Sequence, residues 1–221
     1  MPGLVKAEFH CHTRFSKDSI TQVEDLIAEC RRKKIDRLVI TDHNTISGAE
    51  LASQLAPDLI IVGEELMTEK GELLAFFVKE ALPRGLKPTR AIELLRQQSA
   101  FISVSHPFDS MRNGAWALAD LEEIVPLVDA IETFNSRCSM QNANHAAVDF
   151  ARKHSLKGTA GSDAHTLWEI GRATLWLENF TNAEELNRSL VQARSEVRPS
   201  PFWVHFASSY ARVYKQMKKV R

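Results

Sequence analysis

The stretch LVKAEFHCH, residues 4–12, combines a short run typical of a β-strand with two histidines at its end. Side chains two positions apart on a strand share a face, so His10 and His12 point the same way and Cys11 points to the other side. One H-x-H pair is a weak signal, because two unrelated polar residues at a strand end explain it equally well. Its meaning depends on how the other strands of the chain end.

Short apolar runs alternate with amphipathic segments of helical spacing along most of the chain. The helical patterns cover 21–34, 89–98 and 142–154. Strand, helix and strand in repeated order predict a parallel sheet, and about seven units without a G-x-G-x-x-G after the first strand favour a closed or nearly closed α/β barrel. The predicted strands are LVKAEFH (4–10), RLVIT (37–41), LIIVG (59–63), LLAFFV (73–78), FISVSH (101–106), VDAIETF (128–134) and SLKGTAG (155–161), with ATLWL (173–177) as a candidate eighth.

Other predicted strands also end in histidine or a carboxylate. In a parallel barrel the carboxyl ends of the strands meet at one mouth. Carboxylates and imidazoles gathered there would repel one another or lose hydration unless cations neutralised them. Nitrogen and oxygen donors favour Mn²⁺, Zn²⁺ or Fe²⁺ over an all-oxygen Ca²⁺ or Mg²⁺ site or a thiolate zinc site. The strand-end residues are Asp42-His43, Glu64-Glu65, His106-Pro107 and Asp163-Ala164-His165.

The composition is that of an ordinary globular protein. The chain has 221 residues, 44% of them hydrophobic, which suffices for one large domain or at most two small ones. Lysine plus arginine and aspartate plus glutamate each number 28, so no global charge favours nucleic acid or an anionic membrane. We expect no signal peptide, no transmembrane segment and no disulfide framework among the three scattered cysteines, and therefore a cytoplasmic location.

The last part of the chain differs in character. We assign residues 1–198 to the catalytic domain and 199–221 to a basic tail that begins Pro199-Ser200-Pro201. We expect its aromatic stripe to pack onto the barrel as a terminal helix. The alternative is a helix that binds a membrane surface or a partner. The stripe comprises Trp203, Phe206, Tyr210, Val213 and Met217.

Taken together, the motifs resemble the PHP (polymerase and histidinol phosphatase) family. The match runs in order from residue 7 to about residue 177. The resemblance implies a single-domain α/β fold, a distorted (βα)7 TIM-like barrel, with two or three divalent metal ions that hydrolyse phosphoesters. The motifs are HCHTRFSKDS (10–19), ITDHNT (40–45), VGEE (62–65), SHPFD (105–109), ETFNSR (132–137) and GSDAH (161–165).

The resemblance also implies the metal ligands. Glu65, rather than Glu64, would bridge a first and a second metal ion. Asp42 would fix an imidazole, unless it only caps a helix or a turn. Glu72 departs from the family, because many relatives have histidine where this chain has GELL (71–74), which changes charge and reach at the second metal. The first metal would take His10, His12, Glu65 and Asp163, the second Glu65 and His106, and the third Asp18, His43 and His165.

The expected mechanism uses no protein nucleophile, since no Ser-His-Asp elbow, paired catalytic cysteine or P-loop is present. A hydroxide that bridges two metal ions is the expected attacking group. Arg137 is the first choice and Arg14 the second for binding the substrate phosphate, and Asn135 would orient Arg137 or the substrate. Either arginine could instead be a solvated surface charge.

The expected function is hydrolysis of a small phosphorylated metabolite or nucleotide. A phosphodiesterase or exonuclease on single-stranded nucleic acid is an alternative, but it needs a basic groove, and few clustered lysines and arginines are expected near the mouth. An amidohydrolase-type C–N hydrolase is a second alternative, although it typically adds a bridging lysine or carboxylate and one late aspartate. A non-catalytic metal-stabilised module is a third.

Overall fold

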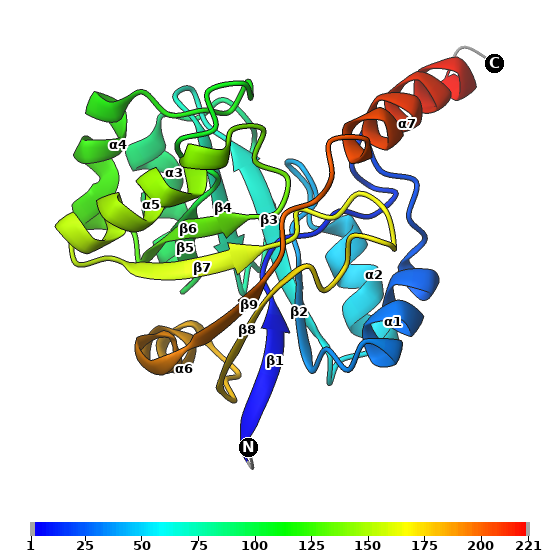
Figure 1. Ribbon diagram of the computed structural model, residues 1–221, viewed down its shortest axis with the longest axis horizontal. Coiled ribbons are helices and arrows are strands. Elements are labelled where there is room, and N and C mark those ends of the chain that lie inside the picture. The colour runs from blue at the N-terminus through cyan, green and yellow to red at the C-terminus, as the bar shows by residue number, and fades with distance from the viewer. Residues whose placement is uncertain (1–2, 220–221) are drawn as a thin grey trace.

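Nine strands form one mixed sheet in the computed structural model, which describes residues 3–219. Their order is β7-β6-β5-β4-β3-β2-β1-β8-β9. Because β7 also contacts β8, the two ends of the sheet approach each other and the sheet is a nearly closed barrel (Figure 1). The strands are β1 (Leu4–Glu8), β2 (Arg37–Ile40), β3 (Ile60–Met67), β4 (Glu72–Phe76), β5 (Phe101–Val104), β6 (Ala130–Asn135), β7 (Lys157–Gly161), β8 (Ala173–Glu178) and β9 (Arg194–Val197).

Each of the seven predicted strands and the candidate eighth overlaps an observed strand, but the predicted parallel (βα)7 repeat is wrong at β4. This strand is antiparallel to both β3 and β5. The turn between β3 and β4 is too short for a helical crossover, and Thr68 closes it by hydrogen bonds to Gly71. The sequence analysis missed β9, whose RSEV stretch is mostly exposed and polar.

Five of the helices cover the sheet in two groups. In Figure 1, α1 and α2 lie together on one side of the sheet, and α3, α4 and α5 lie together on the other. No helix in the described residues 3–219 is long and apolar enough to cross a membrane. The helices are α1 (Val23–Arg32), α2 (Ser47–Leu55), α3 (Pro88–Gln97), α4 (Leu118–Ile124), α5 (Gln141–Lys153), α6 (Ala183–Ser189) and α7 (Val204–Lys219), with 3-10 turns at Val125–Leu127 and Leu190–Gln192.

Apolar side chains form three clusters. One cluster includes Phe9, Phe76 and Phe101. The ring of Phe76 is tilted against Phe9 and stacked on Phe101, with centroid separations of 5.5 and 5.6 Å. A second lies under α3, α4 and α5, and a third under α1 and α2. Cys11 belongs to the third cluster, so it points away from the two neighbouring histidines, as predicted. This packing fixes the strand ends from which the polar residues project.

The last helix does not pack as predicted. Its buried residues are Val204, Ser208 and Ala211, which face the domain. The aromatic stripe lies on the opposite face, with Phe206 66% and Tyr210 60% exposed. The expectation that the stripe packs onto the barrel is therefore wrong, because hydrogen bonds to the domain hold the other face of α7. Residues 1–2 of the expected domain and 220–221 of the expected tail lie outside the described residues.

Candidate metal centre

The eight predicted ligands lie together at the carboxyl ends of the strands. Seven of them lie in the segments that follow β1, β2, β5 and β7, and the eighth, Glu65, belongs to β3. All are buried apart from His43, whose side chain is 16% exposed. They are His10, His12, Asp18, His43, Glu65, His106, Asp163 and His165.

The first group comprises His10, His12 and Asp163, whose ligand atoms lie within 4.8 Å of one another. The Nε2 atoms of His12 and His10 are 3.1 and 3.6 Å from Oδ1 of Asp163. The histidines share a strand end, while Asp163 comes from the loop after β7, and a backbone hydrogen bond from Asp163 to the carbonyl of His10 joins the two segments. Two imidazoles and one carboxylate suit a divalent transition metal.

The second group surrounds Glu65. Its Oε1 lies 3.0 Å from His106 Nε2, and its Oε2 lies 2.9 Å from His43 Nδ1. Glu72 joins this group, with its carboxylate oxygens 3.5 Å from His106 Nε2 and 3.8 Å from His43 Nδ1. A Cβ at Gly114 would come within 2.1 Å of Glu72, so the glycine leaves the space that this carboxylate occupies.

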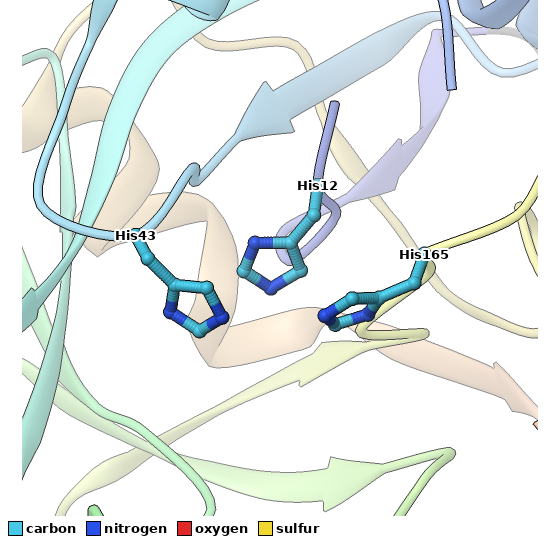
Figure 2. A group of neighbouring side chains, drawn as sticks. All are labelled: His12, His43 and His165. Carbon is cyan, nitrogen blue, oxygen red and sulfur yellow. The ribbon is translucent and has the colours of Figure 1, made fainter. Parts of the chain in front are cut away.

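The third group is formed by His12, His43 and His165, whose rings point toward one another (Figure 2). Asp18 adds a carboxylate, with Oδ1 3.4 Å from His43 Nε2 and 3.3 Å from His165 Nε2. His12 and His43 each belong to two groups, so the three groups form one continuous cluster.

The buried charges of the cluster shift the pKa values of its own residues. Burial, together with the charges of His165 and His43, lowers the pKa of His12 to about 4. Burial and the charge of Glu65 raise the pKa of Glu72. Asp18 Oδ1 and Glu65 Oε2 are buried without a hydrogen-bond partner in the described part of the chain. Buried carboxylate oxygens left without donors, beside several imidazoles, fit divalent metal ions.

Asp42 contacts the cluster indirectly, through Ser16. Its Oδ1 accepts a hydrogen bond of 2.5 Å from Ser16 Oγ, which lies 3.1 Å from His12 Nδ1. The same oxygen accepts from the backbone N–H of Thr13 at 2.7 Å, so Asp42 also organises the turn. A Cβ at Gly48 would come within 2.2 Å of Asp42, so this glycine lets α2 approach closely. Asp42 can thus both orient the imidazole of His12, through Ser16, and stabilise the turn at Thr13.

The sequence analysis assigned no role to two further residues of the cluster. Glu132 lies 2.9 Å from His10 Nδ1 and accepts a 2.9 Å hydrogen bond from the backbone N–H of His106. Arg112 donates to Asp163 Oδ2 at 2.6 Å. Glu132 stands at the start of the quoted ETFNSR motif, which was a usable signal, whereas Arg112 lies in a loop without a recognisable pattern.

The predicted substrate residues lie in different surroundings. Arg137 is buried, donates from Nη2 to Val204 O and Ser208 Oγ of α7 at 3.0 and 2.6 Å, and lies 3.3 Å from Glu169. Asn135 donates to Asp163 at 3.2 Å and to Glu132 at 3.1 Å, so it orients carboxylates of the cluster. Arg14 is exposed and hydrogen-bonded to Gln22.

The cluster opens into a cavity of about 260 Å³ beside α7. The residues of the cluster that line it are Asp18, His43, Glu72 and His165, and the cavity also contacts Arg112, Arg137 and Arg212. Carboxylates, imidazoles and guanidinium groups therefore line the same cavity, with Arg112 and Arg212 in contact with Asp163 and Asp18 of the cluster. Such an arrangement can bind both metal ions and an anion.

Comparisons of sequence relate this chain to known proteins. A family model described as PHP-associated matches residues 141–195. The uncharacterised protein MJ0417 of Methanocaldococcus jannaschii is 34% identical over 201 residues, which cover 90% of this chain and 77% of that protein. A second uncharacterised protein of the same organism, MJ1587, is 31% identical over 146 residues, which cover 60% of this chain and 82% of that protein.

Solved structures share the fold at low sequence identity. PsfC from Pseudomonas syringae has a TM-score of 0.68 and 18% identity over 97% of this chain and 99% of that chain. A protein of Bifidobacterium adolescentis assigned as a metal-dependent phosphoesterase has a TM-score of 0.62 and 16% identity, over 84% of this chain and 95% of that chain. An amidohydrolase from Chromobacterium violaceum, with sulfate bound and no metal, has a TM-score of 0.58 and 13% identity, over 92% of this chain and 96% of that chain.

Proposed function

Because this chain belongs to the PHP family, we propose that it is a metal-dependent hydrolase that cleaves phosphoesters with two or three divalent ions. One observation carries the proposal: three overlapping groups of imidazoles and carboxylates line one buried cluster at the strand ends. Core packing alone does not explain such a cluster, since each buried charge without a partner costs free energy of folding. Divalent cations remove that cost.

The chain's own residues divide into three proposed sites. His10, His12 and Asp163 would hold the first ion, with Glu65 bridging to the second. His106 and Glu72 would complete the second site, and Asp18, His43 and His165 would hold the third. Nitrogen and oxygen donors together favour Mn²⁺, Zn²⁺ or Fe²⁺. Bound there, such ions would activate water and draw charge from the phosphoryl oxygens.

Arginines that line the same cavity are proposed to bind the phosphate. Arg112 is 20% exposed, lines the cavity and already donates to one carboxylate, so its fork is oriented toward the cluster. Arg137 remains a proposed phosphate ligand, although its Nη2 is hydrogen-bonded to α7. Asn135 would keep Asp163 and Glu132 in place while the phosphate binds.

The test is loss of metal and turnover together in Asp163→Ala. We expect the rate to fall by orders of magnitude and the metal content to fall with it, because the variant lacks a carboxylate of the cluster. The protein is first loaded with Mn²⁺, Zn²⁺ or Fe²⁺. Its metal content is then measured by mass spectrometry, and its hydrolysis rates are measured on phosphomonoesters, nucleotides, oligonucleotides and amides. Asp149→Ala, an exposed site on α5, is the matched control. Unchanged metal and rate in Asp163→Ala would contradict the assignment, and turnover of amides alone would favour the C–N hydrolase.

A further inference from the structure

A second hollow, of about 840 Å³, adjoins the cavity of the metal centre. The two share Lys17, His43 and Arg212, so the hollow begins where the cavity ends. We call it the basic groove. Six of its lining residues carry a positive charge and none carries a carboxylate; the six are Arg14, Lys17, Arg84, Arg212, Lys215 and Lys218.

Three distant segments of the chain supply these charges. Arg14 and Lys17 belong to the loop after β1, Arg84 belongs to the segment between β4 and α3, and the others belong to α7. The last helix is joined to the loop after β1, because Lys215 Nζ donates to the carbonyls of Arg14 and Ser16. The expectation of few clustered cations near the mouth is therefore wrong, since α7 brings them there from the far end of the sequence.

The charges of the groove are incompletely neutralised. Arg14 donates to the uncharged Gln22, and its guanidinium lies 5.4 Å from the ring of Phe15. Lys17 and Arg84 are exposed and form no ion pair in the described part of the chain. Lys218 lies 4.8 Å from the ring of Tyr214. A protein of zero net charge thus carries a local positive field beside its metal centre.

We propose that the basic groove binds a chain of phosphates that extends from the phosphoester at the metal centre. This proposal rests on the proposed function and specifies its substrate class as a linear polyanion, either an oligonucleotide or inorganic polyphosphate. Guanidinium and ammonium groups that line the groove can pair with successive phosphates, and the shared residues Lys17 and Arg212 connect the groove to the cavity of the cluster. A single small phosphomonoester would reach only a few of these six cations.

Binding is measured without metal, so that it does not depend on turnover. Fluorescence anisotropy of a fluorescein-labelled ten-nucleotide RNA is titrated with full-length protein in EDTA, and unlabelled polyphosphate is the competitor. We expect the logarithm of the binding constant to fall against the logarithm of the salt concentration with a slope of roughly −2, the value for about three neutralised phosphates on a single strand. Arg14→Glu and Arg84→Glu should each weaken binding about five- to tenfold and flatten that slope.

Lys153→Glu is the matched control, because Lys153 is an exposed lysine at the end of α5, away from α7 in Figure 1. Salt-independent binding of the parent protein, or an equal loss in Lys153→Glu, would overturn the proposal. Phe15, which is 38% exposed, distinguishes an oligonucleotide from polyphosphate as the natural ligand. If bases stack on its ring, Phe15→Ala weakens the binding of RNA and leaves the binding of polyphosphate unchanged. If polyphosphate is the substrate, Phe15→Ala leaves the binding of both ligands unchanged. Groove binding without hydrolysis of any phosphoester would refute only the proposed function, and hydrolysis without groove binding would refute only this inference.

Discussion

Arg212 donates from Nη2 to Oδ2 of Asp18 at 2.9 Å, and this contact joins the last helix to a proposed metal ligand 194 positions earlier. The other oxygen of the same carboxylate faces His43 and His165. These two imidazoles hold the pKa of Asp18 well below its ordinary value, although burial opposes them. The carboxylate is therefore shared between a fixed guanidinium and the proposed third metal site.

We expect Arg212→Gln to bind the third metal ion more tightly. Removing a cation beside a divalent ion removes repulsion, and at this half-exposed position the gain should be about three- to tenfold in affinity. Competition with a fluorescent chelator measures it. Arg188→Gln, which removes an exposed arginine from α6, should leave the affinity as in the parent. Weaker metal binding in Arg212→Gln would show that Arg212 instead positions Asp18.

Glu72→Gln should lower the metal content by about one ion per chain, because the second group loses its second carboxylate. Glu72→His should restore the content and shift the preference from Mn²⁺ toward Zn²⁺, which imidazole suits better. Mass spectrometry after dialysis against each metal gives both values. The exposed Glu123 on α4 provides the control Glu123→Gln. Equal content and preference in all three variants would remove Glu72 from the ligand set.

Glu8 should make the metal-free protein less stable as the pH rises. Burial raises the pKa of Glu8 from 4.5 to about 7. Between pH 4.5 and pH 7, Glu8 loses its proton in the unfolded chain and keeps it in the folded chain. The free energy of unfolding therefore falls with rising pH, by about 3 kcal/mol over the whole range. Glu8→Gln lacks this loss, so its stability relative to the parent should rise from pH 4.5 to pH 8. Urea unfolding in EDTA measures the difference at each pH, and a constant difference would contradict the prediction.

Arg137→Ala is expected to act on two properties. Loss of a phosphate contact should lower kcat/KM by the equivalent of about 1.5–3 kcal/mol while bound metal stays unchanged, and Arg137→Lys should recover part of it. Loss of the buried partner of Glu169 should also lower the free energy of unfolding by about 3 kcal/mol. Steady-state kinetics and urea unfolding separate the two effects. A stability loss with unchanged kcat/KM would make Arg137 a structural residue that anchors α7, and Arg112 would remain for the phosphate.

The sequence predicted the parts of this molecule that depend on local patterns. His10 and His12 share a face because they are two apart, and Asp163 meets them because parallel strands end at the same mouth. Glu65 was preferred to Glu64, and the alternation of β3 does place Glu65 in the cluster. Glu64 instead accepts a hydrogen bond from the backbone of Leu82.

Other features depend on contacts between distant residues, which no local pattern records. The orientation of β4 follows from the short turn at Thr68. The face by which α7 packs follows from polar partners such as Arg137, whereas its apolar stripe suggested the opposite face. The metal roles of the eight residues and the substrate role of Arg14 stay predictions for the experiments above.

The position of α7 has a consequence for the order in which the protein becomes active during synthesis. Among the described elements, this helix is the last to leave the ribosome, yet it supplies Arg212, Lys215 and Lys218. A nascent chain can fold the strands that carry the histidines while its groove is still incomplete. The affinity for a phosphate chain should therefore arise only after α7 has been made and has docked, which would keep a partly synthesised molecule from retaining polyanions, including the messenger RNA beside it.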